Sequence, residues 1–168
     1  LEIMKAYREH IVKMFRLFGF SEQAARDRME RILSLENRIA ETSLSATELR
    51  DVEANYNKMS IADFRKTYPA FPLDGLMKAK GINEKYYQHL VLGQPKFMAG
   101  LNAILKDINV DDLRAKLEWD AINEASDVLG DAVAAEAFDF GGRVMSGRQV
   151  DYPRWRKATS LVQVILGE

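Results

Sequence analysis

Apolar residues recur at intervals of three and four along most of the chain, and this spacing predicts amphipathic helices. The first stripe ends before Gly19, a residue type that commonly terminates helices. A second helix is predicted to begin after Ser21, which can cap it, and to run to about Ala40. The predicted buried faces consist of Met4, Tyr7, Ile11, Met14, Phe15 and Phe18, then Ala25, Met29, Ile32, Leu33, Ile39 and Ala40.

The middle of the chain predicts shorter elements. Ser60 and Asp63 are spaced as a capping box that opens a helix of one or two turns before Pro69. Residues 86–92, Tyr-Tyr-Gln-His-Leu-Val-Leu, form the only strand-like run. Because a lone strand cannot build a sheet, we interpret this run as extended chain or as part of a small hairpin.

The last third of the chain is helical in pattern again, with helices beginning near Phe97, Asn109 and Asp131. Pro153 suits the first turn of a final helix. The pattern therefore predicts an all-α fold, an irregular multi-helix bundle with long amphipathic helices and at most one short strand or hairpin. We expect a single helical domain over residues 1–168.

Composition narrows the function classes. The chain has 168 residues, of which 47% are hydrophobic and 29% charged, so it can bury a core and should be globular. A formal net charge of −1 argues against nucleic-acid binding, and no apolar run is long enough for a membrane helix. Without cysteine there are no disulfides and no thiolate chemistry. The chain starts in mid-pattern at Leu1, so we expect a piece of a longer polypeptide.

The two histidines do not form a metal-binding motif. Met14 stands four residues after His10, and Gly93 four residues after His89, so the His-Glu-x-x-His pattern of zinc hydrolases is absent. We expect each histidine to be at the surface or partly buried, with no catalytic residue, metal ligand or cofactor in this span.

Charge changes sign near the end of the chain. Residues 107–139 hold ten acidic residues against two basic ones at helical spacing, which favours a solvated face over a calcium loop. The basic segment that follows, residues 143–157, is expected to face the acidic one. A nucleic-acid patch at Arg-Trp-Arg-Lys is the weaker alternative, because it is short and the chain is slightly acidic.

Five segments occur in an order that carries a family resemblance. They are LENRIAETS (35–43), YNKMSIADF (56–64), LVLGQPKFMAGL (90–101), DDLRAKLEWDAI (111–122) and RWRKATSLVQVILGE (154–168). As a set they resemble the N-terminal region of the neprilysin-like (M13-type) zinc metallopeptidases, over nearly the whole chain. Ala158 and Thr159 stand where animal members have a cysteine, so the chain resembles the bacterial type. A tryptophan usual in the family near Phe71 is absent.

The resemblance implies a mostly helical region that forms the larger part of a cap domain. The cap faces a thermolysin-like zinc domain across a chamber and restricts entry to peptides. The zinc ligands and the catalytic Glu belong to the C-terminal part, so the implied cofactor is zinc in the parent protein. The implied partners are the C-terminal zinc peptidase domain of the same chain and its peptide substrates. The resemblance favours a bacterial envelope location and leaves a cytoplasmic one open.

One polar feature stands out within the predicted core. Glu36 falls in the middle of the second apolar stripe, and burying an unpaired carboxylate costs several kcal/mol. The segment Asn55-Tyr56-Asn57, continuing to Ser60, can supply donors, and Arg154 beside Trp155 is the other candidate. We interpret this set as a structural polar lock between helices rather than a ligand site.

Two functional hypotheses follow. The first is a helical substrate-gating domain fragment of a neprilysin-like zinc metalloendopeptidase that cleaves peptides, not catalytic on its own. The alternative is a free-standing helical protein-interaction module that binds another protein in a groove between helices. For the isolated piece we also expect exposed apolar helix faces, which favour an oligomer.

Overall fold

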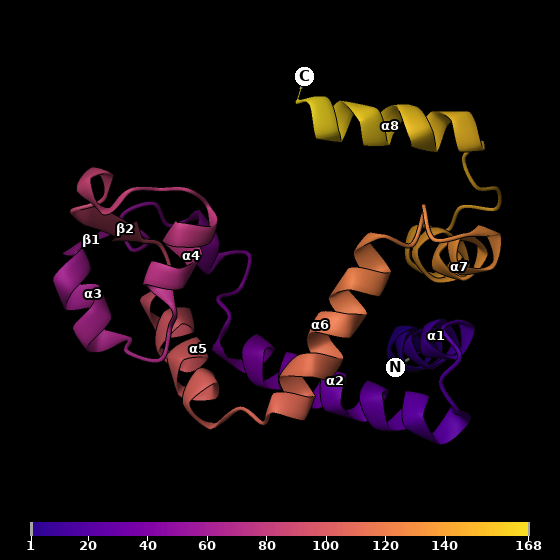
Figure 1. Cartoon of the computed structure of the whole chain (residues 1–168), viewed down its shortest axis with the longest axis horizontal. Coiled ribbons are helices and arrows are strands. Elements are labelled where there is room, and N and C mark those ends of the chain that lie inside the picture. Colours follow the sequence, from indigo (N-terminus) through magenta and orange to yellow (C-terminus); the bar gives the residue numbers. More distant parts are fainter. Residues whose placement is uncertain (1, 168) are drawn as a thin grey trace. The chain divides into compact units, whose positions relative to one another are not determined.

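The computed structural model describes residues 2–167, which form two compact units that we treat separately (Figure 1). Unit 1 is Leu1–Ile32 with Asp111–Glu168, and unit 2 is Leu33–Val110. The all-α prediction is confirmed, since helices dominate and the strands of the described part form one two-stranded sheet. The expectation of one domain over residues 1–168 stays a prediction, because a division into compact units does not by itself define separate domains.

Unit 1 is built from helices on both sides of the unit 2 segment in sequence. Their bounds are α1 (Glu2–Leu17), the first half of α2 (Glu22–Thr42), α6 (Val110–Glu124), α7 (Asp131–Ala137), the π-helical turn η3 (Phe138–Val144) and α8 (Arg154–Leu166). Gly19 ends the first helical segment with φ of +85°, and the Ser21 hydroxyl accepts a 3.2 Å hydrogen bond from the Ala24 N–H. The predicted helix stop and cap are both confirmed.

The core of unit 1 follows the predicted stripe of α1 only in part. Ile11, Met14 and Phe15 are fully buried as expected. Met4 and Phe18 are 47% and 42% exposed, against prediction. Phe18 follows the last residue of α1, and Met4 lies in the first turn, so neither end of the stripe is covered by a neighbouring helix.

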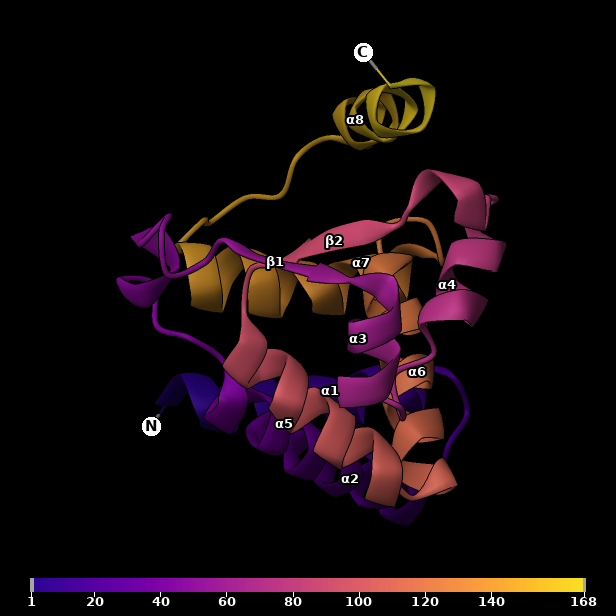
Figure 2. The same ribbon diagram turned by 90° about the vertical axis from the view of Figure 1, so that its left-hand side faces the viewer.

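Unit 2 contains the end of α2 and shorter elements. These are the 3₁₀ turns η1 (Glu48–Arg50) and η2 (Glu84–Tyr86), the strands β1 (Asn57–Ser60) and β2 (His89–Leu92), and helices α3 (Ile61–Thr67), α4 (Leu73–Ala79) and α5 (Pro95–Asp107). Its core is a buried cluster of Ile61, Phe64, Tyr68, Leu73 and Leu92. Figure 2 shows the two strands side by side with α3 beneath them.

The sheet explains the strand-like run near residue 90. Strand β2 pairs antiparallel with β1, with Asn57 opposite Leu92 and Ser60 opposite His89. The extended conformation is confirmed for His89–Leu92, whereas Tyr86, at the start of the predicted run, belongs to the 3₁₀ turn η2. The partner strand lies far earlier in the chain, so the pair is not a hairpin. Ser60 also caps α3, because its hydroxyl accepts a 3.0 Å hydrogen bond from the Asp63 N–H.

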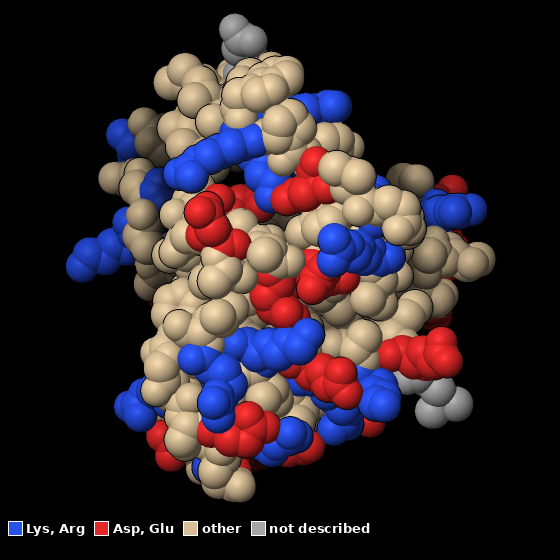
Figure 3. Space-filling view, turned by 90° about the vertical axis from the view of Figure 1, so that its right-hand side faces the viewer, with Lys and Arg blue, Asp and Glu red and all other residues tan. Residues whose placement is uncertain are grey.

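The acidic and basic segments near the end of unit 1 meet as expected. Lys157 donates to Asp127 at 2.8 Å and also pairs with Asp151, and Arg154 lies 3.6 Å from Asp131. Although burial opposes the charged form, the hydrogen bonds from Lys157 to the two carboxylates hold its pKa above the ordinary value. Figure 3 shows acidic and basic side chains intermixed over this face, without a large field of one sign.

Helix α8 leaves its apolar side chains uncovered by the described residues. Trp155, Val164 and Ile165 are 70%, 80% and 71% exposed. The expected exposed apolar face is therefore present on α8. Within residues 2–167, no helix combines the length and the apolar character needed to cross a membrane.

Candidate functional site

The predicted polar-lock segment is held by its own hydrogen bonds. The Asn55 amide donates to the Glu48 carbonyl at 3.0 Å, within the turn that precedes β1. The Asn57 amide donates to the Ala54 carbonyl at 2.8 Å and to the Leu92 carbonyl at 3.1 Å, which ties the turn to β2. Tyr56 is 63% exposed between them. The two asparagines thus satisfy backbone carbonyls. A glycine has no side-chain donor for this role, and the single hydroxyl proton of a serine could not make both hydrogen bonds of Asn57.

The other members of the predicted lock lie on two different helices. Glu36 is half-buried on α2 in unit 2 and has an interaction partner. Arg154 and Trp155 belong to α8 in unit 1, where Arg154 pairs with Asp131 and Trp155 is exposed. The pairing of Glu36 with residues 56–60 or with Arg154 stays a prediction, and its test is given in the Discussion.

A buried ionic and aromatic cluster in unit 1 was not predicted. His10 is 3% exposed, and its Nδ1 lies 3.1 Å from Oε1 of Glu136 on α7. Its ring stacks on Phe140 of η3 at 4.7 Å between centroids and meets the Trp119 ring edgewise at 5.4 Å. The expectation of a surface or partly buried histidine was therefore wrong for His10. The sequence held a signal, because His10 lies three residues after Tyr7 on the apolar stripe.

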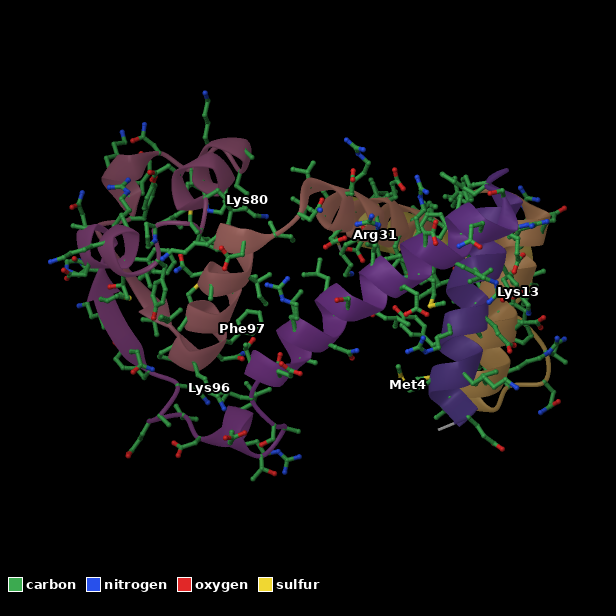
Figure 4. All side chains as sticks on the ribbon, turned by 90° about the horizontal axis from the view of Figure 1, so that it is seen from below. Met4, Lys13, Arg31, Lys80, Lys96 and Phe97 are labelled. Carbon is green, nitrogen blue, oxygen red and sulfur yellow. The ribbon has the colours of Figure 1, made fainter. Side chains whose placement is uncertain are left out.

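The electrostatics of this cluster are those of a structural pair. Burial lowers the pKa of His10, and the hydrogen bond and charge of Glu136 oppose that shift. The second oxygen of Glu136 lies 3.2 Å from the ammonium group of Lys13, which Figure 4 labels on α1. Because the carboxylate accepts, the Nδ1–H of His10 donates. The imidazole is thus engaged with Glu136 and covered by rings, with little freedom to act on a ligand.

Two grooves of unit 1 are lined by described residues. The first, of about 950 Å³, lies between α1, α2 and α7 and is lined by side chains that pair with one another. Arg8 meets Glu30 at 3.1 Å, and Glu22 bridges Arg16 and Arg26 at 3.2 and 2.7 Å. Such mutual pairing leaves few charges available to a ligand.

The second groove, of about 1190 Å³, lies between α6, η3 and α8. Phe138 and Phe140 contribute aromatic surface, and Arg148, Tyr152 and Arg156 come from the segment that leads into α8. Its arginines have fewer partners than those of the first groove, and it therefore offers the more accessible chemistry.

No cluster of three or more His, Asp or Glu side chains that could hold a metal ion occurs within the described range 2–167. His10 is committed to Glu136, and His89 is exposed on β2 in the other unit. The donor set of the described residues therefore does not fit a zinc site of the usual three or four ligands.

Comparison with known proteins gives consistent matches over the full length. The family model described as peptidase family M13 matches residues 1–168. Endothelin-converting enzyme 1 from Bos taurus is 23% identical over 172 residues, which cover 99% of this chain and 22% of the enzyme. The Homo sapiens enzyme gives the same identity and coverage.

Solved structures of a mycobacterial enzyme match the fold. The Mycobacterium tuberculosis zinc metalloprotease ZMP1 in its open state is 28% identical with a TM-score of 0.93, over 99% of this chain and 26% of that one. The same enzyme in complex with an inhibitor gives 28% identity and a TM-score of 0.93, over 99% and 25%. The chain thus spans about a quarter of the length of the relatives that it matches.

Proposed function

Because this chain belongs to peptidase family M13, we propose that it forms a helical, substrate-gating part of a zinc metalloendopeptidase and is not catalytic on its own. In this proposal the zinc, its ligands and the catalytic machinery lie in a C-terminal peptidase domain of the same parent chain. The helical part limits which peptides reach that domain.

The observation that carries the proposal is the full-length match to ZMP1. The same region of that zinc metalloprotease resembles this chain with a TM-score of 0.93 in the open state and in the inhibitor complex, and of 0.83 in a partial open state. The region keeps its fold across these structures, as a gate that moves without unfolding would.

The chemistry of the described residues supports a role without catalysis. The buried His10 is bonded to Glu136 and stacked on Phe140, so its neighbours serve packing. General bases and zinc ligands require an accessible lone pair close to the substrate. We therefore assign the chemistry of hydrolysis to the rest of the parent chain.

The proposal is tested by comparing the isolated chain with its parent protein. Metal analysis should find about one zinc per parent protein and no stoichiometric zinc in the isolated chain. The parent should hydrolyse short peptides in a chelator-sensitive manner, with kcat/KM falling steeply as the substrate lengthens to a folded protein. The isolated chain should hydrolyse none of them.

Two results would contradict the proposal. Chelator-sensitive hydrolysis by the purified isolated chain would place catalysis here. If the parent protein digested folded proteins as fast as short peptides, the gating role would be refuted, although the assignment as a peptidase would stand.

A free-standing interaction module remains the second candidate, because the apolar side chains of α8 are exposed among the described residues. Sequencing the parent gene distinguishes the two. A reading frame that continues into a His-Glu-x-x-His segment supports the peptidase. We also propose that the isolated chain self-associates through α8, which sedimentation at increasing concentration would detect.

A further inference from the structure

Two arginines of unit 1 lie against aromatic rings beside the second groove. The guanidinium carbon of Arg148 lies 5.3 Å from the ring centre of Phe138 and 4.6 Å from that of Tyr152. The guanidinium carbon of Arg156 lies 4.3 Å from the Tyr152 ring centre. Guanidinium groups held on rings lose little further freedom when their N–H edges bind a ligand, so both groups are pre-oriented donors.

One continuous stretch of chain fixes this arrangement. The backbone N–H of Arg148 donates to the Gly142 carbonyl at 2.9 Å and thereby closes the end of η3. The backbone N–H of Arg156 donates to the Pro153 carbonyl at 2.9 Å in the first turn of α8. These local hydrogen bonds fix the main chain from which the two side chains extend.

Arg148 carries an unused donor. Its Nη1 atom is buried and has no hydrogen-bond partner among the described residues. A buried donor of a charged group normally finds an acceptor, because leaving it unpaired costs the full desolvation of that group. Neither Arg148 nor Arg156 forms an ion pair with a carboxylate of the described part, although the charge of Arg148 acts on the nearby Asp151 carboxylate. Their neighbour Lys157 bonds both Asp127 and Asp151.

The charge of the groove selects the ligand. Four basic and three acidic side chains line it: Arg148, Arg154, Arg156, Lys157, Glu124, Asp127 and Asp151. Arg154 is paired with Asp131, which lies outside the lining, so the charges of the groove and this partner balance. A singly charged anion therefore meets less repulsion from the three carboxylates of the groove than a phosphate dianion does. Apolar side chains of α8, Leu161 and Val164, line the same groove.

We propose that Arg148 and Arg156 form a binding site for one carboxylate group attached to an apolar body. The flat edge of a guanidinium matches the two oxygens of a carboxylate, and such charge-assisted pairs are the strongest hydrogen bonds in proteins. The carboxylate binds the guanidinium edges that face the groove, and the apolar body covers the exposed apolar side chains of α8. The site is independent of the zinc chemistry of the parent, and its ligand class follows from the groove alone.

The first test uses the unsubstituted 168-residue chain. Isothermal titration calorimetry compares 3-phenylpropionate with 3-phenylpropanamide, which has the same shape and no charge. The acid should bind on the order of tenfold more tightly than the amide, because only the acid accepts charge-assisted bonds. Inorganic phosphate, titrated in parallel, should bind more weakly than the acid.

The second test uses matched arginine variants. Arg148→Gln should weaken 3-phenylpropionate binding by on the order of tenfold. Arg143→Gln is the control, because Arg143 also lies over Phe138, at 5.1 Å, but is already paired with Asp139. It should leave the affinity unchanged. Circular dichroism melts establish that both variants are folded.

Equal affinities for the acid and the amide, or no binding of either, would overturn the proposal without any variant. An Arg143→Gln loss as large as that of Arg148→Gln would show a general effect of charge rather than a site. If phosphate bound as tightly as the acid, the site would bind anions in general, and the proposed selectivity for a carboxylate would be refuted.

Discussion

Each of the two units of this chain is stabilised internally by a different kind of interaction. Unit 1 packs long helices around aromatic rings and joins them by side-chain pairs, such as Arg28 with Glu118 at 2.9 Å. Unit 2 uses amide and hydroxyl side chains to satisfy the backbone of short elements. The buried Asn102 carbonyl oxygen, for example, accepts a 2.9 Å hydrogen bond from the Ala70 N–H.

The difference follows from element length. A long helix satisfies most of its own backbone groups, so its packing depends on which side chains lie on the buried face. Short helices and a two-stranded sheet leave more backbone groups without partners, and polar side chains must supply them. Substitutions should therefore act through packing in unit 1 and through hydrogen bonds in unit 2.

The largest expected effect is the loss of a core ring in unit 1. Phe15 is fully buried and meets Phe20 edgewise at 5.5 Å, so Phe15→Ala should cost about 3–5 kcal/mol of unfolding free energy. Phe18→Ala is the control, because Phe18 is 42% exposed. Urea denaturation measures both, and hydrogen exchange shows where protection is lost. Equal costs for the two variants would contradict the described core.

A close helix contact gives the next effect, in unit 2. A Cβ atom on Gly100 of α5 would lie 2.1 Å from the Thr42 Cγ2 atom of α2. Gly100→Ala should therefore cost about 1–3 kcal/mol through overpacking. In Gly75→Ala the new methyl group meets nothing within 4 Å, so that variant should be neutral or slightly stabilising. The midpoint of thermal unfolding should fall for Gly100→Ala and should stay the same or rise slightly for Gly75→Ala.

Asn102 tests the role of hydrogen bonds in unit 2 directly. Asn102→Ala leaves the Ala70 N–H without its acceptor and should cost about 1–2 kcal/mol. Asn37→Ala, at an exposed position of α2, should change stability by less than about 0.5 kcal/mol. A measured cost for Asn102→Ala no larger than that of the control would show that packing also governs unit 2.

Glu36 gives a smaller effect, because it is only half-buried. We propose that its carboxylate accepts hydrogen bonds from residues 56–60 or pairs with Arg154, so Glu36→Ala should cost about 1 kcal/mol. Glu36→Gln should cost less if the donors are backbone N–H groups, and nearly as much if the partner is Arg154. Denaturation midpoints of both variants equal to that of the parent would refute the lock.

The smallest effect is a pH dependence centred on His10. Burial lowers the pKa of His10 below its ordinary value of 6.5, although Glu136 opposes this and Lys13 adds to it. The unfolded chain therefore takes up the proton first as the pH falls. The free energy of unfolding should be greatest above about pH 6.5 and should decrease as the pH falls from there toward the pKa of folded His10.

Urea denaturation between about pH 5 and pH 8 measures this dependence. His10→Gln should remove the part of the slope that lies just below pH 6.5, whereas the exposed His89→Gln should leave it unchanged. A slope that survives in His10→Gln would assign the dependence to other groups.

The sequence predicted the helices because their period is local. The stop at Gly19, the cap at Ser60 and the helical character of the chain all follow from neighbours a few residues apart. The pairing of β1 with β2 was not predicted, because the Asn-Lys-Met-Ser strand is mostly polar and its partner is distant. The contact of His10 with Glu136 was also not predicted, because the two residues are far apart in the sequence. Helical spacing indicates that His10 lies on a buried face, but it does not indicate which residue contacts it.

The candidate site was predicted less well than the fold. The basic character of residues 143–157 was recognised, but composition cannot show which arginine is already paired. Arg143 and Arg148 look equivalent in the sequence, yet one has a carboxylate partner and the other lies between two rings. That distinction depends on the folded chain, in which the backbone N–H of Arg148 donates to the Gly142 carbonyl.

In the π-helical turn η3, the number of residues determines the directions in which the Phe138 and Phe140 side chains project. Phe138 and Phe140 are two residues apart, about half a helical turn, so they project to nearly opposite sides of η3. One ring lies beside Arg148 and the other stacks on His10. A Cβ on Gly142 would come within 2.2 Å of the Phe138 ring, so the ring packs directly against this glycine. Deleting a single residue from this turn would rotate one ring out of phase with its partner, so we expect natural variants here to change side chains without insertions or deletions.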